Sequence, residues 1–195
     1  MEQKKMKKKD QQQEMIRDIL NLLCEREVLN REDTVELERE YKKSNLAYFE
    51  DYLIDEDIVD KEDLLKVLQE YYNVQAMDVM GEMFDHDLLK KFPKDVLLRN
   101  CCIPYRQDGS LLIMVTSNPL NEDLDEILGE FVSYDFHYFV GIPRHIDMMI
   151  KDFYQGELYT EDFEDIIDEE AREREDLILD EDGNIISEEQ GRDDE

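Results

Sequence analysis

The side chains that most readily bind metals or attack substrates are few and scattered. The chain has three cysteines and three histidines, namely Cys24, Cys101, Cys102, His86, His137 and His145. No His lies at zinc-ligand spacing from another His or from a Cys. The odd number of cysteines argues against a disulfide framework and favours a reducing compartment, so we expect a cytoplasmic protein. Cys101 and Cys102 stand where an apolar strand begins, which is typical of buried small hydrophobes.

The acidic C-terminal segment contains one pattern that resembles a calcium loop. With Gly183 at the turn position, Asp180, Asp182 and Glu189 fall on ligand positions. The first ligand position is then Ile178, which has no side-chain oxygen. These three acids are therefore weak metal candidates, and neither a metal nor any other cofactor is expected.

A short hairpin is the better interpretation of the same segment. Two apolar clusters flank Asp182-Gly183, a dipeptide that is typical of tight hairpin turns. Because an isolated hairpin is marginal in water, such a segment would dock on a partner or on the body of the protein. The candidate partner-binding residues are Leu177, Ile178, Leu179, Ile185 and Ile186.

A strand-to-helix turn over residues 114–127, "MVTSNPLNEDLDEI", is the kind of place where α/β proteins bind phosphate. The turn has no Gly for close approach, and Glu122 and Asp123 already complement the helix dipole. We therefore expect a structural corner. The chain also has no GxxxxGK[ST], GxGxxG or GxSxG pattern among its seven glycines. The sequence predicts a protein that is not an enzyme.

The charge of the chain is strongly negative and unevenly distributed. A formal net charge of −30 repels nucleic acid and anionic membrane surfaces. No apolar run approaches the roughly 18 residues of a membrane span, so direct membrane insertion is not expected. Residues 156–195 hold 19 Asp and Glu against 3 Arg, which predicts an acidic, largely disordered tail. Residues 1–13 are expected to form a basic, disordered N-terminus.

Residues 14–73 contain an internal repeat with an offset of 30 residues. The segment "VLNREDTVELEREY" at 28–41 aligns with "IVDKEDLLKVLQEY" at 58–71. Asn30 and Asp60 are the predicted N-caps of the helices in these segments. The repeating unit is therefore a helix, a tight turn and a second helix.

The stretches upstream of each copy, at 18–27 and 48–57, also have the pattern of short helices. Four helices are thus expected in this helical repeat subdomain. In the first copy, Val35 and Leu37 are nearly the only apolar residues among charges. We therefore expect the first copy to be less firmly packed than the second.

Residues 74–155 change period and predict a small α/β module. A helix at 85–92 is followed by Pro93, which suits the first turn of another helix. Two strands flank Asp108-Gly109, and the apolar run "LLIMV" is typical of a central strand. Asn118 and Pro119 are expected to cap a helix, followed by a third strand in "YDFHYFVG" and a closing helix. The fold class is α+β: a four-helix repeat, then a module with a three-stranded sheet and flanking helices.

These segments resemble the N-terminal domain of type II secretion and type IV pilus assembly ATPases. The resemblance rests on the paired helix–turn–helix units, on "DLLKKFPKDVLLRNCCIPYRQDGSLLIMVTSNPLNEDLDEI" and on "VGIPRHIDMMIKDFY", and it covers residues 18–155. It implies a bacterial domain that lies ahead of an ATPase core and couples it to the membrane platform of the machine. No such core follows in these 195 residues, so we expect an adaptor or regulator rather than a motor.

Some members of that family bind cyclic di-GMP through two copies of a motif that starts with Arg-Leu-Gly, has a later Gly and ends with Gln. None of the eight corresponding positions matches; they hold Asp18, Leu20, Glu27, Tyr41, Tyr48, Glu50, Asp57 and Tyr71. The preferred hypothesis is a non-catalytic module that acts by protein–protein interaction in a secretion, type IV pilus or related motility machine. The alternative is a nucleotide second-messenger sensor of the cyclic di-GMP type with a degenerate site.

Overall fold

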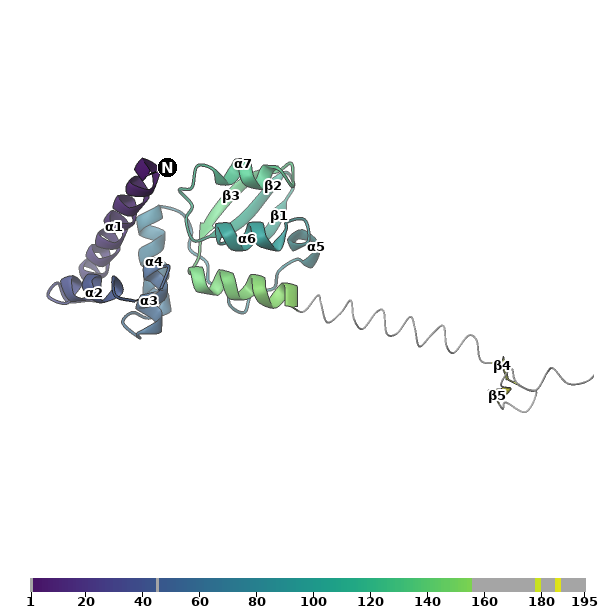
Figure 1. Ribbon diagram of the computed structural model, residues 1–195, viewed down its shortest axis with the longest axis horizontal. Helices are drawn as coiled ribbons and strands as arrows, with labels where there is room; N and C mark the ends of the chain where they lie inside the picture. The colour runs from purple at the N-terminus through teal and green to yellow at the C-terminus, as the bar shows by residue number, and fades with distance from the viewer. Residues whose placement is uncertain (1, 45, 156–177, 180–184, 187–195) are drawn as a thin grey trace, which may run out of the picture. The chain divides into compact units, whose positions relative to one another are not determined.

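The computed structural model describes residues 2–44, 46–155, 178–179 and 185–186, with side chains over 11–44 and 46–155 (Figure 1). By its internal contacts the chain divides into two units, with the boundary between residues 151 and 152. The α+β class predicted from the sequence is confirmed. None of the described helices is long and apolar enough to cross a membrane.

The predicted helical repeat is present as two helix–turn–helix units. The first consists of α1 (Glu2–Glu25) and α2 (Thr34–Tyr41), and the second of α3 (Phe49–Asp55) and α4 (Lys61–Tyr72). Each unit turns through one residue with left-handed backbone, Glu27 at φ 61° and Asp57 at φ 52°. The same hydrogen bond closes both turns at 2.9 Å, from Val28 N to Leu23 O and from Ile58 N to Leu53 O. This is the Schellman helix end, so the repeat in sequence is a repeat in conformation.

One of the two predicted N-caps is correct. Asp60 is the N-cap residue of α4, but the prediction for Asn30 is wrong, because α2 begins at Thr34 with Asp33 as its N-cap. A turn comes first, in which Asp33 N donates to Asn30 O at 3.1 Å. The turn shortens α2 to eight residues, whereas α4 has twelve.

The first copy is less firmly packed than the second, as predicted. In α2, Tyr41 is the single buried residue, and Val35 is 75% exposed. The apolar stripe of α4 is buried along its length, through Leu64, Val67, Leu68 and Tyr72. Burial of that stripe therefore contributes more of the hydrophobic free energy of the helical subdomain.

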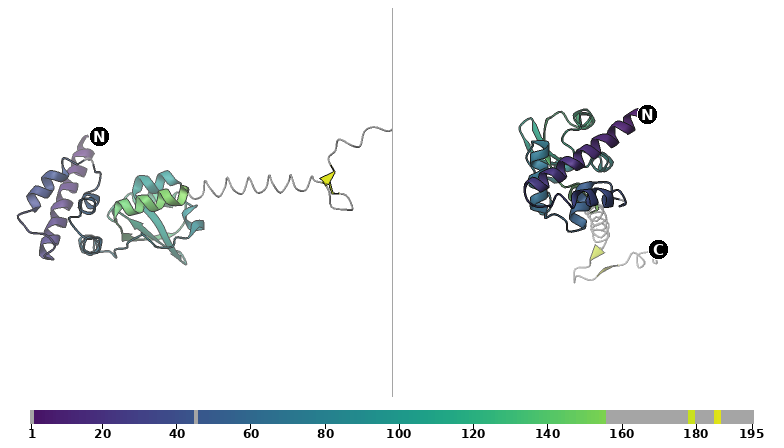
Figure 2. Two further views of the ribbon diagram at one scale, coloured as in Figure 1. Left: turned by 90° about the horizontal axis from the view of Figure 1, so that it is seen from below. Right: turned by 90° about the vertical axis from the view of Figure 1, so that its left-hand side faces the viewer.

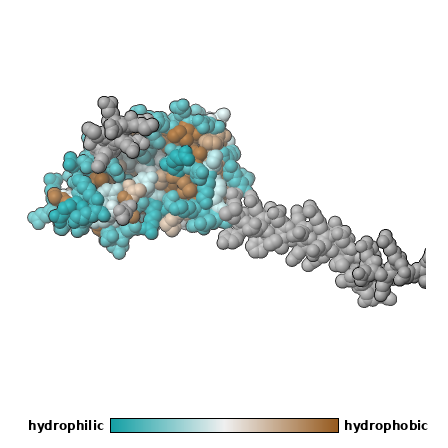
Figure 3. Space-filling model, in the orientation of Figure 1, coloured by the Kyte–Doolittle hydropathy of each residue, from teal (hydrophilic) through white to brown (hydrophobic). Residues whose placement is uncertain are grey.

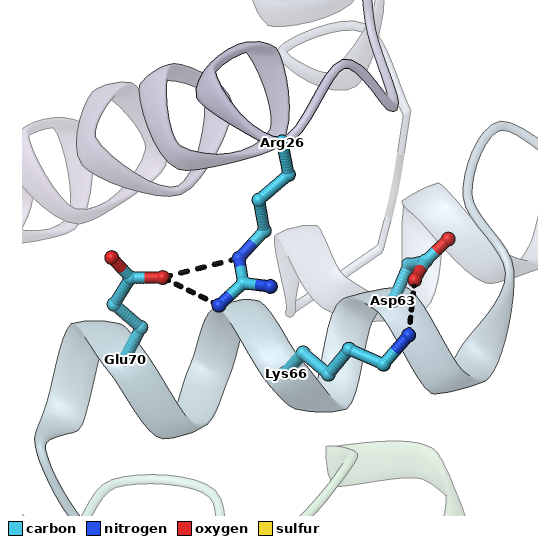
Figure 4. A network of polar contacts seen from close by, with 4 residues as sticks. All are labelled: Arg26, Asp63, Lys66 and Glu70. Carbon is cyan, nitrogen blue, oxygen red and sulfur yellow. Dashed lines mark hydrogen bonds and ion pairs between the residues drawn. The ribbon is translucent and has the colours of Figure 1, made fainter.

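Helix α1 begins at Glu2, which corrects the expectation of a disordered segment over residues 1–13. Lys, Gln, Glu and Met make up most of that segment, and these residues lose little side-chain freedom in a helix. Near the other end of α1, Arg26 donates to Glu70 of α4 with an Nη2–Oε2 distance of 2.7 Å (Figure 4). Lys66 lies on the same side of α4 and pairs with Asp63 at 2.7 Å.

The sheet of the second subdomain has the predicted three strands. Antiparallel pairing joins β1 (Cys102–Asp108) to β2 (Leu111–Thr116), and β2 pairs in parallel with β3 (Asp135–Val140). The order β1-β2-β3 makes the apolar strand central and places Pro104 on an edge strand, as predicted. Gly109 has φ 60° in the hairpin turn, a conformation that favours glycine.

Helices flank the sheet. Two short helices, α5 (His86–Leu89) and α6 (Lys94–Asn100), precede β1, in agreement with the helices predicted at 85–92 and after Pro93. Tyr138 of β3 donates to Asp125 of α7 (Leu124–Gly129) at 2.5 Å. The helix at residues 143–155 runs along the sheet (Figure 2). It lies close to β2, because a Cβ added to Gly141 would meet side chains of both Val115 and Ile146.

Helix α7 starts later than predicted. Its N-cap is Asp123, so the expectation that Asn118 and Pro119 cap this helix is wrong. Asn118 instead accepts from Leu120 N at 3.2 Å, and Asn121 accepts from Asp123 N at 3.3 Å. These two side chains close successive turns that compete with helix formation.

The helical repeat and the sheet share an apolar core. Val140 and Ile142, at the end of β3, belong to the hydrophobic cluster of the helical subdomain. The segment after α4 joins β3 directly, with Met77 N donating to Val140 O at 2.8 Å and Val140 N donating to Gln75 O at 2.9 Å. We call this junction the seam.

Polar contacts also cross the seam. Arg144 donates its backbone N–H to Asp51 at 3.0 Å, and its guanidinium pairs with Asp55. Asp78 accepts from Lys61 of α4 at 2.6 Å and lies 3.1 Å from Nδ1 of His145. Charged groups on α3 and α4 therefore face partners on the sheet side of the junction.

The strand pairing of the predicted C-terminal hairpin is confirmed. Strand β4 (Ile178–Leu179) pairs antiparallel with β5 (Ile185–Ile186). Leu177 and the candidate metal ligands Asp180, Asp182 and Glu189 lie outside the described residues. The disorder of the tail and its role in partner binding stay predictions.

The left-handed residues of the two turns give a first test. The Glu27→Gly and Asp57→Gly substitutions should each raise the free energy of unfolding, because a non-Gly residue in this conformation costs roughly 1 kcal/mol. The greater freedom of Gly in the unfolded chain offsets part of that gain. Urea denaturation measures both variants.

Exposed Glu62, in the first turn of α4, is the matched control, since Gly there should destabilise rather than stabilise the fold. Equal destabilisation by Gly at residues 27, 57 and 62 would contradict the assigned turn conformation.

Candidate functional site

A pocket of about 480 Å³ opens at the seam, where α1, the start of α3, the end of α4 and the turn after β2 meet. Its buried residues are Glu50, Tyr72 and Ser117, and its half-buried ones are Met15 and Tyr71. The exposed rim consists of Gln11, Gln12, Ala47, Tyr48, Asn118 and Leu120. We call it the seam pocket. Its volume is in the range of small-ligand sites.

Glu50 is the most unusual residue of the seam pocket. It is the second residue of α3 and only 2% exposed. Among the buried side-chain nitrogen and oxygen atoms of the described residues, its Oε2 is the one without a hydrogen-bond partner. Burial, with a smaller contribution from the charge of Asp51, raises the pKa of Glu50 to about 7. A carboxyl group that is partly protonated at neutral pH therefore lies at the floor of the pocket.

Three tyrosines surround this carboxyl group in the pocket. Burial, with the charge of Glu50 among the further causes, raises the pKa of Tyr48 to about 12 and also raises the pKa of Tyr71 and Tyr72. The phenols therefore stay protonated at neutral pH. None of the eleven lining residues that the structure describes is Lys or Arg. The pocket is thus aromatic and electrostatically negative.

The cysteines occupy structural positions, as predicted for Cys101 and Cys102. Both are buried, and burial raises the pKa of their thiols to about 11 and about 12. A thiol with such a pKa is a poor nucleophile at neutral pH, because only the thiolate attacks. Cys24, on α1, is half-buried.

The three histidines have different surroundings. His86 and His137 are exposed, and His145 contacts Asp78 at the seam. Within the described residues, no group of three His, Cys, Asp or Glu side chains is placed to hold a metal ion.

Sequence analysis missed the seam pocket, although it singled out several of its residues. Ser117, Asn118 and Leu120 belong to the turn that was interpreted as a structural corner, and they line the pocket. Leu120 is 63% exposed. One signal in the sequence was available. In the second copy of the cyclic di-GMP motif, three of the altered positions hold pocket residues: Tyr48, Glu50 and Tyr71.

A second, wider groove of about 770 Å³ lies between the end of α1 and α4. It is lined by polar residues that include Arg26, Lys66 and Glu70. Both cations already have carboxylate partners at 2.7 Å, as Figure 4 shows. An anionic ligand would have to break these ion pairs, so the groove is a weaker candidate than the seam pocket.

The chain is similar to a known domain family and to solved structures. Residues 72–160 match the MshEN domain family. A structure of MshE with cdg is 18% identical, with a TM-score of 0.54, and the match covers 70% of this chain and 98% of that one. The N-terminal domain of XpsE is 16% identical, with a TM-score of 0.50, over 70% of this chain and 94% of that one. No curated protein matches. The resemblance to the N-terminal domain of type II secretion and type IV pilus assembly ATPases is confirmed.

The raised pKa of Glu50 predicts a specific pH dependence of stability. Between pH 4.5 and about 7 the folded state holds a proton that the unfolded state releases, so stability falls as pH rises through this window and is level above it. The ionised group should cost roughly 3 kcal/mol at pH 8. The Glu50→Gln variant should therefore be more stable than the parent at pH 8 and gain little at pH 5, as measured by urea denaturation at each pH.

Glu62→Gln removes the same charge from an exposed position of α4 and should leave the pH profile unchanged. An equal effect of Glu50→Gln at both pH values would show that Glu50 titrates normally.

Proposed function

We propose that this chain is a non-catalytic adaptor or regulatory module of a secretion, type IV pilus or related motility machine, acting by protein–protein interaction in the cytoplasm. The observation that carries the proposal is the match of residues 72–160 to the MshEN domain. The fold shared with MshE and with the N-terminal domain of XpsE supports it. These 195 residues contain no phosphate-binding loop of the kind that a motor needs.

Exposed apolar side chains on the sheet subdomain offer a contact surface. Met83 is 92% exposed and Met80 is 38% exposed, and the neighbouring Phe84 contacts the ring of Tyr105 at the sheet edge. Most of the face in Figure 3 is hydrophilic, with the larger apolar patches over the α+β module. Flexible Met side chains suit such a contact, because they adapt to irregular partner surfaces.

The tail provides a second proposed contact. Its apolar pairs, Ile178 with Leu179 and Ile185 with Ile186, lie in the short antiparallel strands β4 and β5. The dense acidic charge of residues 156–195 would attract a basic partner surface, and salt would screen that attraction. We infer that the strands contribute apolar anchors and the acidic residues contribute attraction at longer range.

The alternative is a second-messenger sensor, which the structure of MshE with cdg brings into consideration. In the present chain the seam pocket includes Glu50, Tyr48 and Tyr71 at motif positions, and Glu50 carries its charge to the pocket floor. A carboxylate at this position repels a dianionic ligand. The adaptor function is therefore favoured.

Capture from native cells tests the adaptor function. The tagged chain should enrich a component of a secretion, pilus or motility machine, identified by mass spectrometry. Deleting residues 156–195 should weaken capture, with the larger loss at low salt, where unscreened charge contributes most. Capture of proteins that include no envelope-machine component would count against the proposal.

Calorimetry separates the two functions. Cyclic di-GMP, ATP and GTP should give no binding heat at high micromolar concentration, because the described lining of the seam pocket holds no Lys or Arg to offset their phosphates. Micromolar binding of any of the three nucleotides would favour the sensor function over the adaptor function.

A further inference from the structure

The seam pocket combines two features that point to a ligand of positive charge. Its floor holds Glu50, whose Oε2 is buried without a hydrogen-bond partner. Its wall includes the rings of Tyr48, Tyr71 and Tyr72. We propose that the seam pocket binds an organic cation, a guanidinium or ammonium group, with Glu50 as its counter-ion.

The electrostatic surroundings favour a cation, and none of the described residues that line the pocket is itself a Lys or Arg. On α3, the neighbour of Glu50 is Asp51, a second carboxylate that adds to the negative field. On α1, Glu14 and Asp18 add negative charge near Tyr71. The turn at 117–120 contributes no ionisable side chain. A positively charged group that enters the pocket therefore meets attraction from α1 and from α3.

The lining groups also offer aromatic rings and hydrogen-bond acceptors that such a cation can contact. Tyrosine faces attract a cation through the quadrupole of the ring. The side-chain amide oxygens of Gln11, Gln12 and Asn118 on the rim can accept hydrogen bonds, and a guanidinium has five donors. A pocket of about 480 Å³ holds an arginine-sized group.

Two sources share this chemistry, a free small-molecule amine or guanidine and an Arg or Lys side chain of another protein. Cation binding does not depend on the proposed machine context, because it follows from the pocket itself. If the pocket binds no cation, the adaptor function still stands on its own test, and a chain that captures no machine component can still bind a cation.

Binding should be coupled to proton release. The cation requires ionised Glu50, and protonation competes with it. Among the other groups that face Glu50, the phenols of Tyr41, Tyr48, Tyr71 and Tyr72 have a raised pKa and stay protonated near neutrality. Burial also raises the pKa of the Asp51 carboxyl group. Only the fraction of molecules with ionised Glu50 is competent, so affinity should be about tenfold higher at pH 8 than at pH 6.

An NMR titration of the full 195-residue chain tests the proposal. The probes are butylguanidine and a blocked Gly-Arg-Gly peptide. Their neutral ureido analogues are butylurea and the same peptide with citrulline in place of Arg. A charged probe should shift the amide signals of residues 48, 50 and 71 in a saturable way, and its neutral analogue should bind at least about tenfold more weakly. Binding of butylguanidine alone identifies a small-molecule source, and tighter binding of the peptide identifies a protein side chain.

Two variants and their controls complete the test. Glu50→Gln should lower the affinity at least about tenfold and abolish its pH dependence, whereas Glu62→Gln should change neither. Tyr71→Leu should weaken binding several-fold, and Tyr71→Phe, which keeps the ring, should not. No saturable shift up to millimolar probe, equal binding of the neutral analogues, or unchanged binding to Glu50→Gln would each overturn the proposal.

Discussion

The structure depends on the apolar junction between the helical repeat and the sheet. The four helices of the repeat bury too little surface alone, and Val140 and Ile142 from the end of β3 complete their core. Backbone hydrogen bonds to Val140 and the pairs of Arg144 with Asp51 and Asp55 hold the same junction. Any pocket at this seam therefore forms only when both subdomains are folded and in contact.

Glu50 lies at that junction and changes its chemistry. Burial of this carboxyl group, with one of its oxygens unpaired, outweighs the backbone hydrogen bonds from Glu50 and Phe49, so its pKa rises and the group is partly neutral at pH 7. At the corresponding position of the family motif, Gly would leave open space and no charge. With Glu50 and two tyrosines at motif positions, the pocket disfavours phosphate and favours a cation. A shared fold does not by itself fix the electrostatic character of a site.

Local signals in the sequence predicted most of the fold. The 30-residue repeat, the Asp108-Gly109 hairpin and the apolar central strand depend on neighbours in the chain, and all three were found. The start of α7 was missed because two Asn side chains close turns in place of a helix. The seam pocket could not be predicted, since Gln12, Glu50, Tyr72 and Ser117 meet only through tertiary packing. The burial of Glu50, which raises its pKa, is likewise a product of that packing.

The carboxyl ¹³C shift of Glu50, followed by NMR as a function of pH, measures the central quantity directly. Assignment follows from the Glu50→Gln variant, which lacks the signal. The folded protein should show this carboxyl titrating near pH 7, well above the ordinary value of 4.5. Titration near 4.5 would show that Glu50 is solvated or paired, and it would remove the basis for a cation pocket at the seam.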